Sequence, residues 1–198
     1  MELILVRHAR PERSEATADP ELSLLGRDQA ARVARWLAAD PVDAVWSSTM
    51  RRAVQTAEPF AAQAKREIRQ HAGIVEFDRA SGVYIPTEDL KRENFAAWQA
   101  MANGGDGVDM ETFQTTVVAT MEEIVAAHPG ETVAVFCHGG VINVWAAHVL
   151  GMRPRVFFEA DYTSINRFIC SRQGHRSVVS LNERAHLRGE NSPGISTS

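Results

Sequence analysis

Three short apolar segments, each followed directly by a helical pattern, constrain the fold of this chain most strongly. They cover residues 3–6, 42–48 and 132–137. Short runs rich in aliphatic and β-branched residues predict buried strands. Because strands that alternate with helices are typical of a parallel sheet covered by helices, we expect an α/β fold. The specific expectation is a three-layer α/β/α sandwich with a mostly parallel central sheet.

Hydrophobic periodicity predicts the remaining elements. Apolar residues at helical spacing predict helices over residues 24–40, 49–65, 109–128 and 141–150. A further short strand is predicted over residues 73–77, where Glu76 stands among apolar neighbours. Alternating segments on either side of a short QGH turn predict a hairpin of strands 163–170 and 177–181.

The length of 198 residues suits one domain with a sizeable core. We expect this domain to cover residues 1–188. A small helical lid insertion is expected at about 78–109, with a helix over residues 90–101. The polar segment 189–198, GENSPGISTS, is predicted to be a flexible tail.

Composition excludes several classes of protein. With 44% hydrophobic and 23% charged residues, the chain has the composition of a globular protein, and no apolar stretch approaches the length of a membrane span. A signal-peptide pattern is absent from the N-terminus, so we expect a cytoplasmic protein without a membrane partner. The net charge of -4 disfavours a nucleic-acid partner. Cys137 and Cys170 are predicted to be buried free thiols, and a monomer and a homodimer remain open.

Arginine or histidine follows each of the three apolar segments. Arg7 and His8 end the first, the Arg51-Arg52 pair opens the helix after the second, and His138 follows the third, directly before Gly139-Gly140. If the strands are parallel, their carboxyl ends meet at one edge of the sheet, where α/β proteins bind ligands. Arginine suits phosphate or carboxylate, and histidine can act as a base, nucleophile or ligand. The sequence therefore predicts an anion site at this edge.

Four motifs stand in an order that is typical of a known family. They are LVRHA at residues 5–9, SSTMRRAVQTA at 47–57, VEFD at 75–78 and CHGG at 137–140. Together they resemble the histidine phosphatase superfamily, the phosphoglycerate-mutase-like proteins. The resemblance implies a histidine acid phosphatase-like phosphomonoester hydrolase. It would act on a small phosphorylated metabolite and would need no metal and no other cofactor.

The resemblance also implies roles for individual residues. His8 matches the nucleophile that forms a phosphohistidine, which water then hydrolyses. Arg7, Arg51 and His138 match the groups that hold the phosphoryl oxygens, and a backbone N–H near Gly139 would add a donor.

Other matches concern the proton donor and two departures from the family pattern. Glu76 matches the general acid, and Asp78 and Glu88 in the lid are alternative candidates. Ser14 stands where the mutase branch has an Asn that helps to hold phosphate, so it is a further candidate phosphate ligand. Ala9 replaces the usual Gly, and this alanine would be strained if its φ were positive.

Three other functions stay open from the sequence. A phospho-ligand-binding regulator would keep the anion site with weak or no turnover. A phosphoglycerate-type mutase is disfavoured because the chain is short and lacks the longer insert of that branch. A metal-dependent hydrolase would use His8, His138, Glu76 and Asp78 as ligands, and the nearby arginines argue against it because cations repel a metal ion. The physiological substrate cannot be derived from the sequence.

Overall fold

A six-stranded sheet forms the centre of the computed structural model, which describes residues 1–77, 82–102 and 109–188. The strand order is β3-β2-β4-β1-β5-β6. Strands β1 to β4 are parallel, and β5 is antiparallel to both β1 and β6. The strands are β1 (Glu2–Arg7), β2 (Ala44–Ser48), β3 (Ile68–His71), β4 (Thr132–Cys137), β5 (Ile165–Cys170) and β6 (Arg176–Glu183). The prediction of a mostly parallel central sheet is confirmed.

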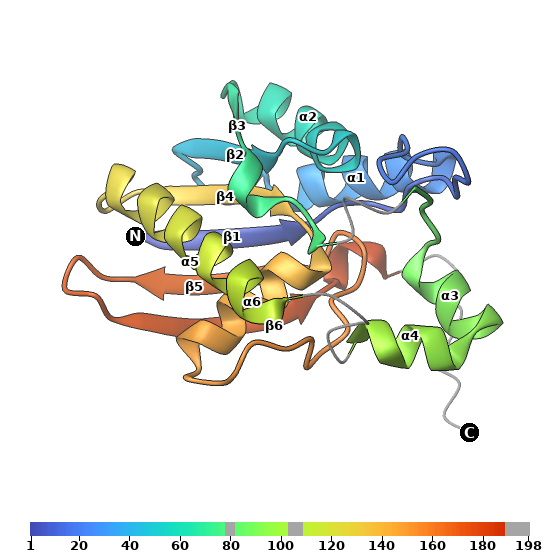
Figure 1. The fold of residues 1–198 in the computed structure, drawn as a ribbon. Coiled ribbons are helices and arrows are strands. Elements are labelled where there is room, and N and C mark those ends of the chain that lie inside the picture. The colour runs from blue at the N-terminus through green and yellow to red at the C-terminus, as the bar shows by residue number, and fades with distance from the viewer. Residues whose placement is uncertain (78–81, 103–108, 189–198) are drawn as a thin grey trace.

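Helices cover both faces of this sheet, so the predicted three-layer sandwich is also confirmed (Figure 1). Helices α1 (Leu24–Leu37) and α2 (Arg51–Ala64) lie on one face, and α5 (Met110–Ala127) and α6 (Gly139–Val149) lie on the other. The short helices α3 (Thr87–Glu93) and α4 (Phe95–Ala102) lie beyond the carboxyl end of β1. Two 3-10 turns complete the described elements, η1 (Ala72–Ile74) and η3 (Ala185–Leu187).

Strand β1 shows how the apolar pattern produces the two cores. Leu3 and Leu5 pack with residues of α5 and α6, whereas Ile4 and Val6 pack with residues of α1 and α2. All four side chains are fully buried. Successive side chains of a strand point to opposite faces, so a strand covered on both sides must be continuously apolar. This requirement fixes β1 in the middle of the sheet and places Arg7 at its carboxyl end.

The segment around Glu76 differs from its prediction. Residues 73–77 form no strand: the turn η1 ends at Ile74, and Glu76 follows it in a loop. The strand of this region is β3, which lies directly before η1 and pairs with β2 at the edge of the sheet. The sequence of β3, IRQH, has one apolar residue because an edge strand needs little burial. Its pattern therefore gave no strand signal.

The predicted lid helix over residues 90–101 is two helices. Asn94 separates α3 from α4 with non-helical backbone angles, φ -150° and ψ 82°. Its side-chain oxygen accepts a hydrogen bond from the N–H of Ala97 at 3.0 Å and so caps α4. Parts of the predicted lid, residues 78–81 and 103–108, and the predicted tail 189–198 lie outside the described residues.

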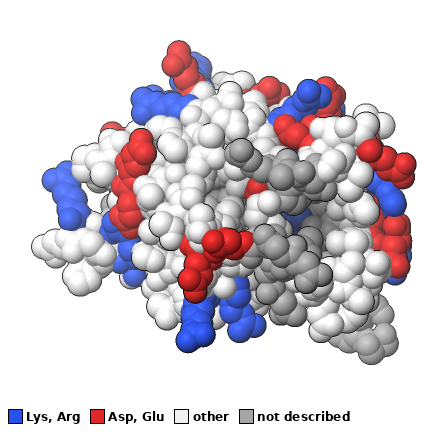
Figure 2. All heavy atoms as spheres, viewed as in Figure 1, with Lys and Arg blue, Asp and Glu red and all other residues white. Residues whose placement is uncertain are grey.

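Three further observations concern surface and composition. No helix in the described part of the chain is long and apolar enough to cross a membrane. Acidic and basic side chains are interspersed over the face seen in Figure 2. Cys137 and Cys170 are buried free thiols, as predicted.

Candidate active site

The carboxyl ends of β1, β2 and β4 bring four basic side chains together. Arg7 and His8 follow β1, Arg52 is the second residue of α2 after β2, and His138 directly precedes α6 after β4. All four are buried. We call this group the His8 cluster. It lies where the parallel order of the strands predicts a ligand site.

His8 is held in one orientation inside the cluster. Only 2% of the residue is exposed, and Nδ1 lies 2.8 Å from the carbonyl oxygen of Ala9. A carbonyl oxygen only accepts, so Nδ1 carries the proton and Nε2 carries the lone pair. The Nε–H of Arg52 donates to Nε2 at 3.3 Å.

The surroundings of His8 keep its ring neutral. Burial lowers the pKa of His8 well below 6.5, and the nearby Arg52, His138 and Arg7 lower it further. The imidazole therefore keeps its lone pair on Nε2 under neutral conditions. This is the form that a nitrogen nucleophile requires.

Arg7 and Arg52 are both anchored through backbone carbonyl groups. Arg7 donates from Nη1 to the oxygen of Ala160 at 2.5 Å, and Arg52 donates from Nη1 to the oxygen of Ala18 at 2.7 Å. The Arg52 residue is fully buried although it carries a charge. Two fixed guanidinium groups beside one imidazole form a site that suits a dianion such as phosphate.

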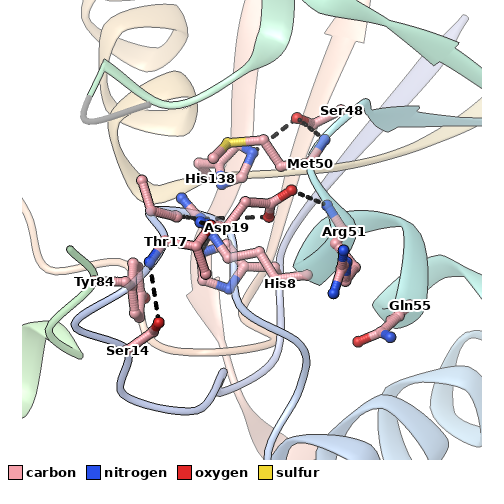
Figure 3. Close-up of polar contacts among 12 residues, drawn as sticks. His8, Ser14, Thr17, Asp19, Ser48, Met50, Arg51, Gln55, Tyr84 and His138 are labelled. Atoms are coloured by element: carbon pink, nitrogen blue, oxygen red, sulfur yellow. Dashed lines mark hydrogen bonds and ion pairs between the residues drawn. The ribbon is translucent and has the colours of Figure 1, made fainter. Parts of the chain in front are cut away.

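The structure does not bring Arg51 into this site, contrary to its predicted role. The Arg51 side chain is 57% exposed and lies 3.4 Å from Glu21. Figure 3 shows Arg51 to the side of His8, with its backbone N–H bonded to Asp19. Helix α2 begins at Arg51, and consecutive residues of a helix point about 100° apart, so Arg52 turns inward and Arg51 outward.

A sequence signal for Arg52 was present. Arg52 is spaced by four residues from Thr56 and by eight from Phe60, so all three share the buried stripe of α2. Arg51 lies off this stripe. Helical periodicity selects the inward arginine of the pair, which the motif resemblance alone did not.

His138 faces His8 across the cluster. The two ring centres are 5.0 Å apart, and Nε2 of His138 is 2.9 Å from the hydroxyl oxygen of Ser48 (Figure 3). Burial lowers the pKa of His138 well below 6.5, and Arg52 and Arg7 add to the effect. A bound dianion would oppose the two arginines and favour the protonated ring.

Glu76 lies at the N-terminus of α6, beside Gly139 and Gly140. The N–H of Gly140 donates to Oε2 at 2.9 Å, and the N–H of Phe77 donates to Oε1 at 3.2 Å. A Cβ atom on residue 140 would overlap Oε1 of Glu76 and lie 2.6 Å from the Phe77 ring, so a larger residue there would displace both side chains. A Cβ on Gly139 would lie 3.6 Å from Nε of Arg7, an ordinary contact. Gly139 thus lies beside Arg7, and the missing side chain of Gly140 leaves room for the Glu76 carboxylate.

Three further candidates from the sequence are Ser14, Glu88 and Asp78. The Ser14 hydroxyl accepts hydrogen bonds from the N–H groups of Ala16 and Thr17, both at 3.2 Å, and so serves its own loop (Figure 3). Glu88 lies on α3, and its Oε2 atom is buried without a hydrogen-bond partner in the described part of the chain. Asp78 lies outside the described residues.

Ala9 shows no backbone strain. Non-glycine residues with positive φ in the described ranges are Lys65, Thr163 and Asn182. Ala9 is therefore in an ordinary conformation, and its side chain is fully buried beside Leu22 and Ala30. Alanine instead of the usual glycine leaves the backbone beside His8 unstrained.

Several residues with contacts to the cluster were not predicted from the sequence. Thr56 accepts from the N–H of Ala9 at 2.9 Å and donates to the oxygen of Arg52 at 2.6 Å, so it connects the end of β1 to α2. Thr56 belongs to the QTA part of the second motif, so a signal existed. Tyr84 and Tyr162 contact Arg52 and Arg7, and isolated tyrosines in irregular segments gave no signal.

The described residues contain no group of three or more His, Cys, Asp and Glu side chains placed to hold a metal ion. The positive charge at this sheet edge comes from the arginine side chains.

Comparisons with known proteins identify the family and the fold. A family model for the histidine phosphatase superfamily (branch 1) matches residues 3–184. Phosphoserine phosphatase 1 of Hydrogenobacter thermophilus is 26% identical, over 94% of each chain. The solved phosphoserine phosphatase of Entamoeba histolytica superposes with a TM-score of 0.74 at 24% identity, over 94% of this chain and 98% of that chain. A mycobacterial glucosyl-3-phosphoglycerate phosphatase superposes with a TM-score of 0.77 at 19% identity, over 92% and 99%.

Proposed function

We propose a mechanism for this chain, which belongs to the histidine phosphatase superfamily (branch 1) and is a phosphomonoester hydrolase. In this mechanism the phosphoryl group of a small metabolite is transferred first to His8 and then to water. The neutral, oriented ring of His8 carries this proposal. Its proton is held on Nδ1 by Ala9, and its Nε2 lone pair faces the buried guanidinium of Arg52.

The first step joins Nε2 of His8 to phosphorus while the bond from phosphorus to the leaving oxygen breaks. Arg7 and Arg52 neutralise the non-bridging oxygens, and His138 joins them in its protonated form. We assign to Glu76 the proton that the leaving oxygen takes up.

The second step restores the enzyme. The Glu76 carboxylate takes a proton from water, whose oxygen attacks phosphorus as the bond to Nε2 breaks. Inorganic phosphate then leaves, and His8 and Glu76 return to their first states. The two guanidinium groups supply the positive charge that a metal ion supplies in many other phosphoryl-transfer enzymes, so we propose a reaction without a metal.

The names of the relatives direct the search for a substrate. Phosphoserine phosphatase and glucosyl-3-phosphoglycerate phosphatase are named for small phosphorylated metabolites. O-phosphoserine is therefore the first compound to test, and 3-phosphoglycerate is the compound that tests mutase activity. We further propose that the protein works in the cytoplasm.

One experiment separates these functions. Wild type and His8→Ala are assayed with p-nitrophenyl phosphate and O-phosphoserine in the presence of a chelator. We expect turnover by wild type only. Equal turnover by the variant would overturn the proposal, and loss of wild-type turnover in chelator would indicate a metal-dependent hydrolase. Tight vanadate binding without turnover of any substrate would favour the ligand-binding regulator.

A further inference from the structure

Two buried tyrosines contact the two arginines of the His8 cluster. The guanidinium carbon of Arg7 lies 4.0 Å from the centre of the Tyr162 ring, and that of Arg52 lies 4.8 Å from the centre of the Tyr84 ring. A guanidinium within about 6 Å of an aromatic face is attracted to it, most strongly where water is excluded. Both tyrosines are only 5% exposed, so each ring holds one guanidinium in dry surroundings.

The two tyrosines also contact each other beside the nucleophile. Their hydroxyl oxygens lie 3.4 Å apart, and the Tyr162 ring centre is 5.6 Å from that of His8. Tyr84 exchanges two backbone hydrogen bonds with Ser14, at 3.0 and 2.7 Å. Through Ser14, the contact between Tyr84 and Tyr162 therefore joins the loop after β1 to the segment before β5.

We propose that Tyr162 and Tyr84 position Arg7 and Arg52 for the phosphoryl group. The inference rests on the proposed phosphatase function. Burial raises the pKa of Tyr162 well above 10.0, so its hydroxyl stays protonated and able to donate a hydrogen bond.

Vanadate binding tests the positioning role without requiring turnover. The dissociation constant is measured by calorimetry for Tyr162→Leu and Tyr84→Leu, and for the phenylalanine variants, which keep the rings. We expect each leucine variant to bind vanadate about 5- to 30-fold more weakly, because the aromatic face is lost. The phenylalanine variants should bind within about twofold of wild type.

Trp46→Leu is the matched control. The Trp46 ring also contacts a guanidinium, that of Arg69 at 5.8 Å, but outside the His8 cluster. This variant should lose thermal stability and keep the vanadate affinity of wild type. Folded leucine variants that bind vanadate as tightly as wild type would overturn the positioning role. If Tyr162→Leu does not fold, Tyr162→Met keeps more of the side-chain bulk and is measured in its place.

One control separates this inference from the proposed function. If wild type hydrolyses neither p-nitrophenyl phosphate nor O-phosphoserine, the proposed function fails, whereas the vanadate titration still decides the positioning role.

Discussion

The Nε–H of Arg52 donates to Nε2 of His8 at 3.3 Å, on the lone pair that we propose attacks phosphorus. Arg52 thus occupies the position that a phosphoryl group needs, and it keeps Nε2 from being protonated. A substrate must enter between the two groups, after which the guanidinium bonds to phosphoryl oxygens instead. We therefore expect turnover to depend on Arg52 rather than on Arg51.

Replacing the two neighbouring arginines separates their roles. Arg52→Ala should lower kcat/KM by about 10²- to 10³-fold, because a buried cation is lost from the transition state. Arg51→Ala should stay close to wild type, since it removes only an exposed pair with Glu21. Steady-state kinetics of both variants, with thermal melts to establish folding, check this. A larger loss for Arg51→Ala would contradict the inward placement of Arg52.

The two glycines after His138 should differ in their tolerance of a methyl group. Gly140→Ala would force Glu76 and Phe77 to move, so kcat should fall and the melting temperature should drop. Gly139→Ala makes only an ordinary contact with Arg7 and should lose much less activity. Steady-state kinetics and thermal melts of the two variants test this expectation. Equal losses of kcat would contradict a role for the contact between Gly140 and Glu76.

Stability should fall as the pH drops below 6.5. Burial lowers the folded-state pKa of His8 and His138 well below 6.5 and, with help from Arg32, that of His186 to about 4. Between these values and 6.5 the unfolded chain binds more protons than the folded one, so the free energy of unfolding rises with pH. Urea titrations from pH 7.5 to 5 measure the effect. His186→Gln should reduce the slope, and a slope of the opposite sign would refute the account.

Ala9→Gly restores the residue that is usual in the family, and it should not help. Ala9 has no positive φ, so glycine relieves no strain, while the unfolded chain gains freedom and a buried methyl group is lost. We expect a loss of about 1 kcal/mol in the free energy of unfolding. Chemical denaturation tests this, and a more stable or more active variant would mean that alanine distorts the end of β1.

The sequence predicted the fold well wherever burial determines the pattern of apolar residues. The strands β1, β2 and β4 and the helices after them follow apolar runs and helical spacing, and Arg7, His8 and His138 follow from the strand ends. Strand β3 could not be found in this way, because an edge strand with the sequence IRQH needs little apolar surface. The apolar residues around Glu76 predicted a strand that the structure does not form. Ile74 is apolar because the turn η1 packs it against the core.

Parts of the site depend on information that motifs do not contain. The choice between Arg51 and Arg52 depends on where α2 begins, and the boundary of a helix is its least predictable property. Tyr84 and Tyr162 reach the cluster from segments without regular structure, so their positions follow from tertiary packing alone. Ser14 stands where the mutase branch of the family has a phosphate-binding Asn, whereas in the structure its hydroxyl accepts hydrogen bonds within its own loop.

The phosphohistidine itself provides the most direct test of the central claim. Wild-type protein is mixed rapidly with O-phosphoserine or p-nitrophenyl phosphate, quenched in base and digested, and the phosphorylated peptide is located by mass spectrometry. The account predicts a phosphoryl group on His8 that forms and decays during turnover and is absent from His8→Ala. Turnover with the phosphoryl group on another residue, or sustained hydrolysis by His8→Ala, would contradict it.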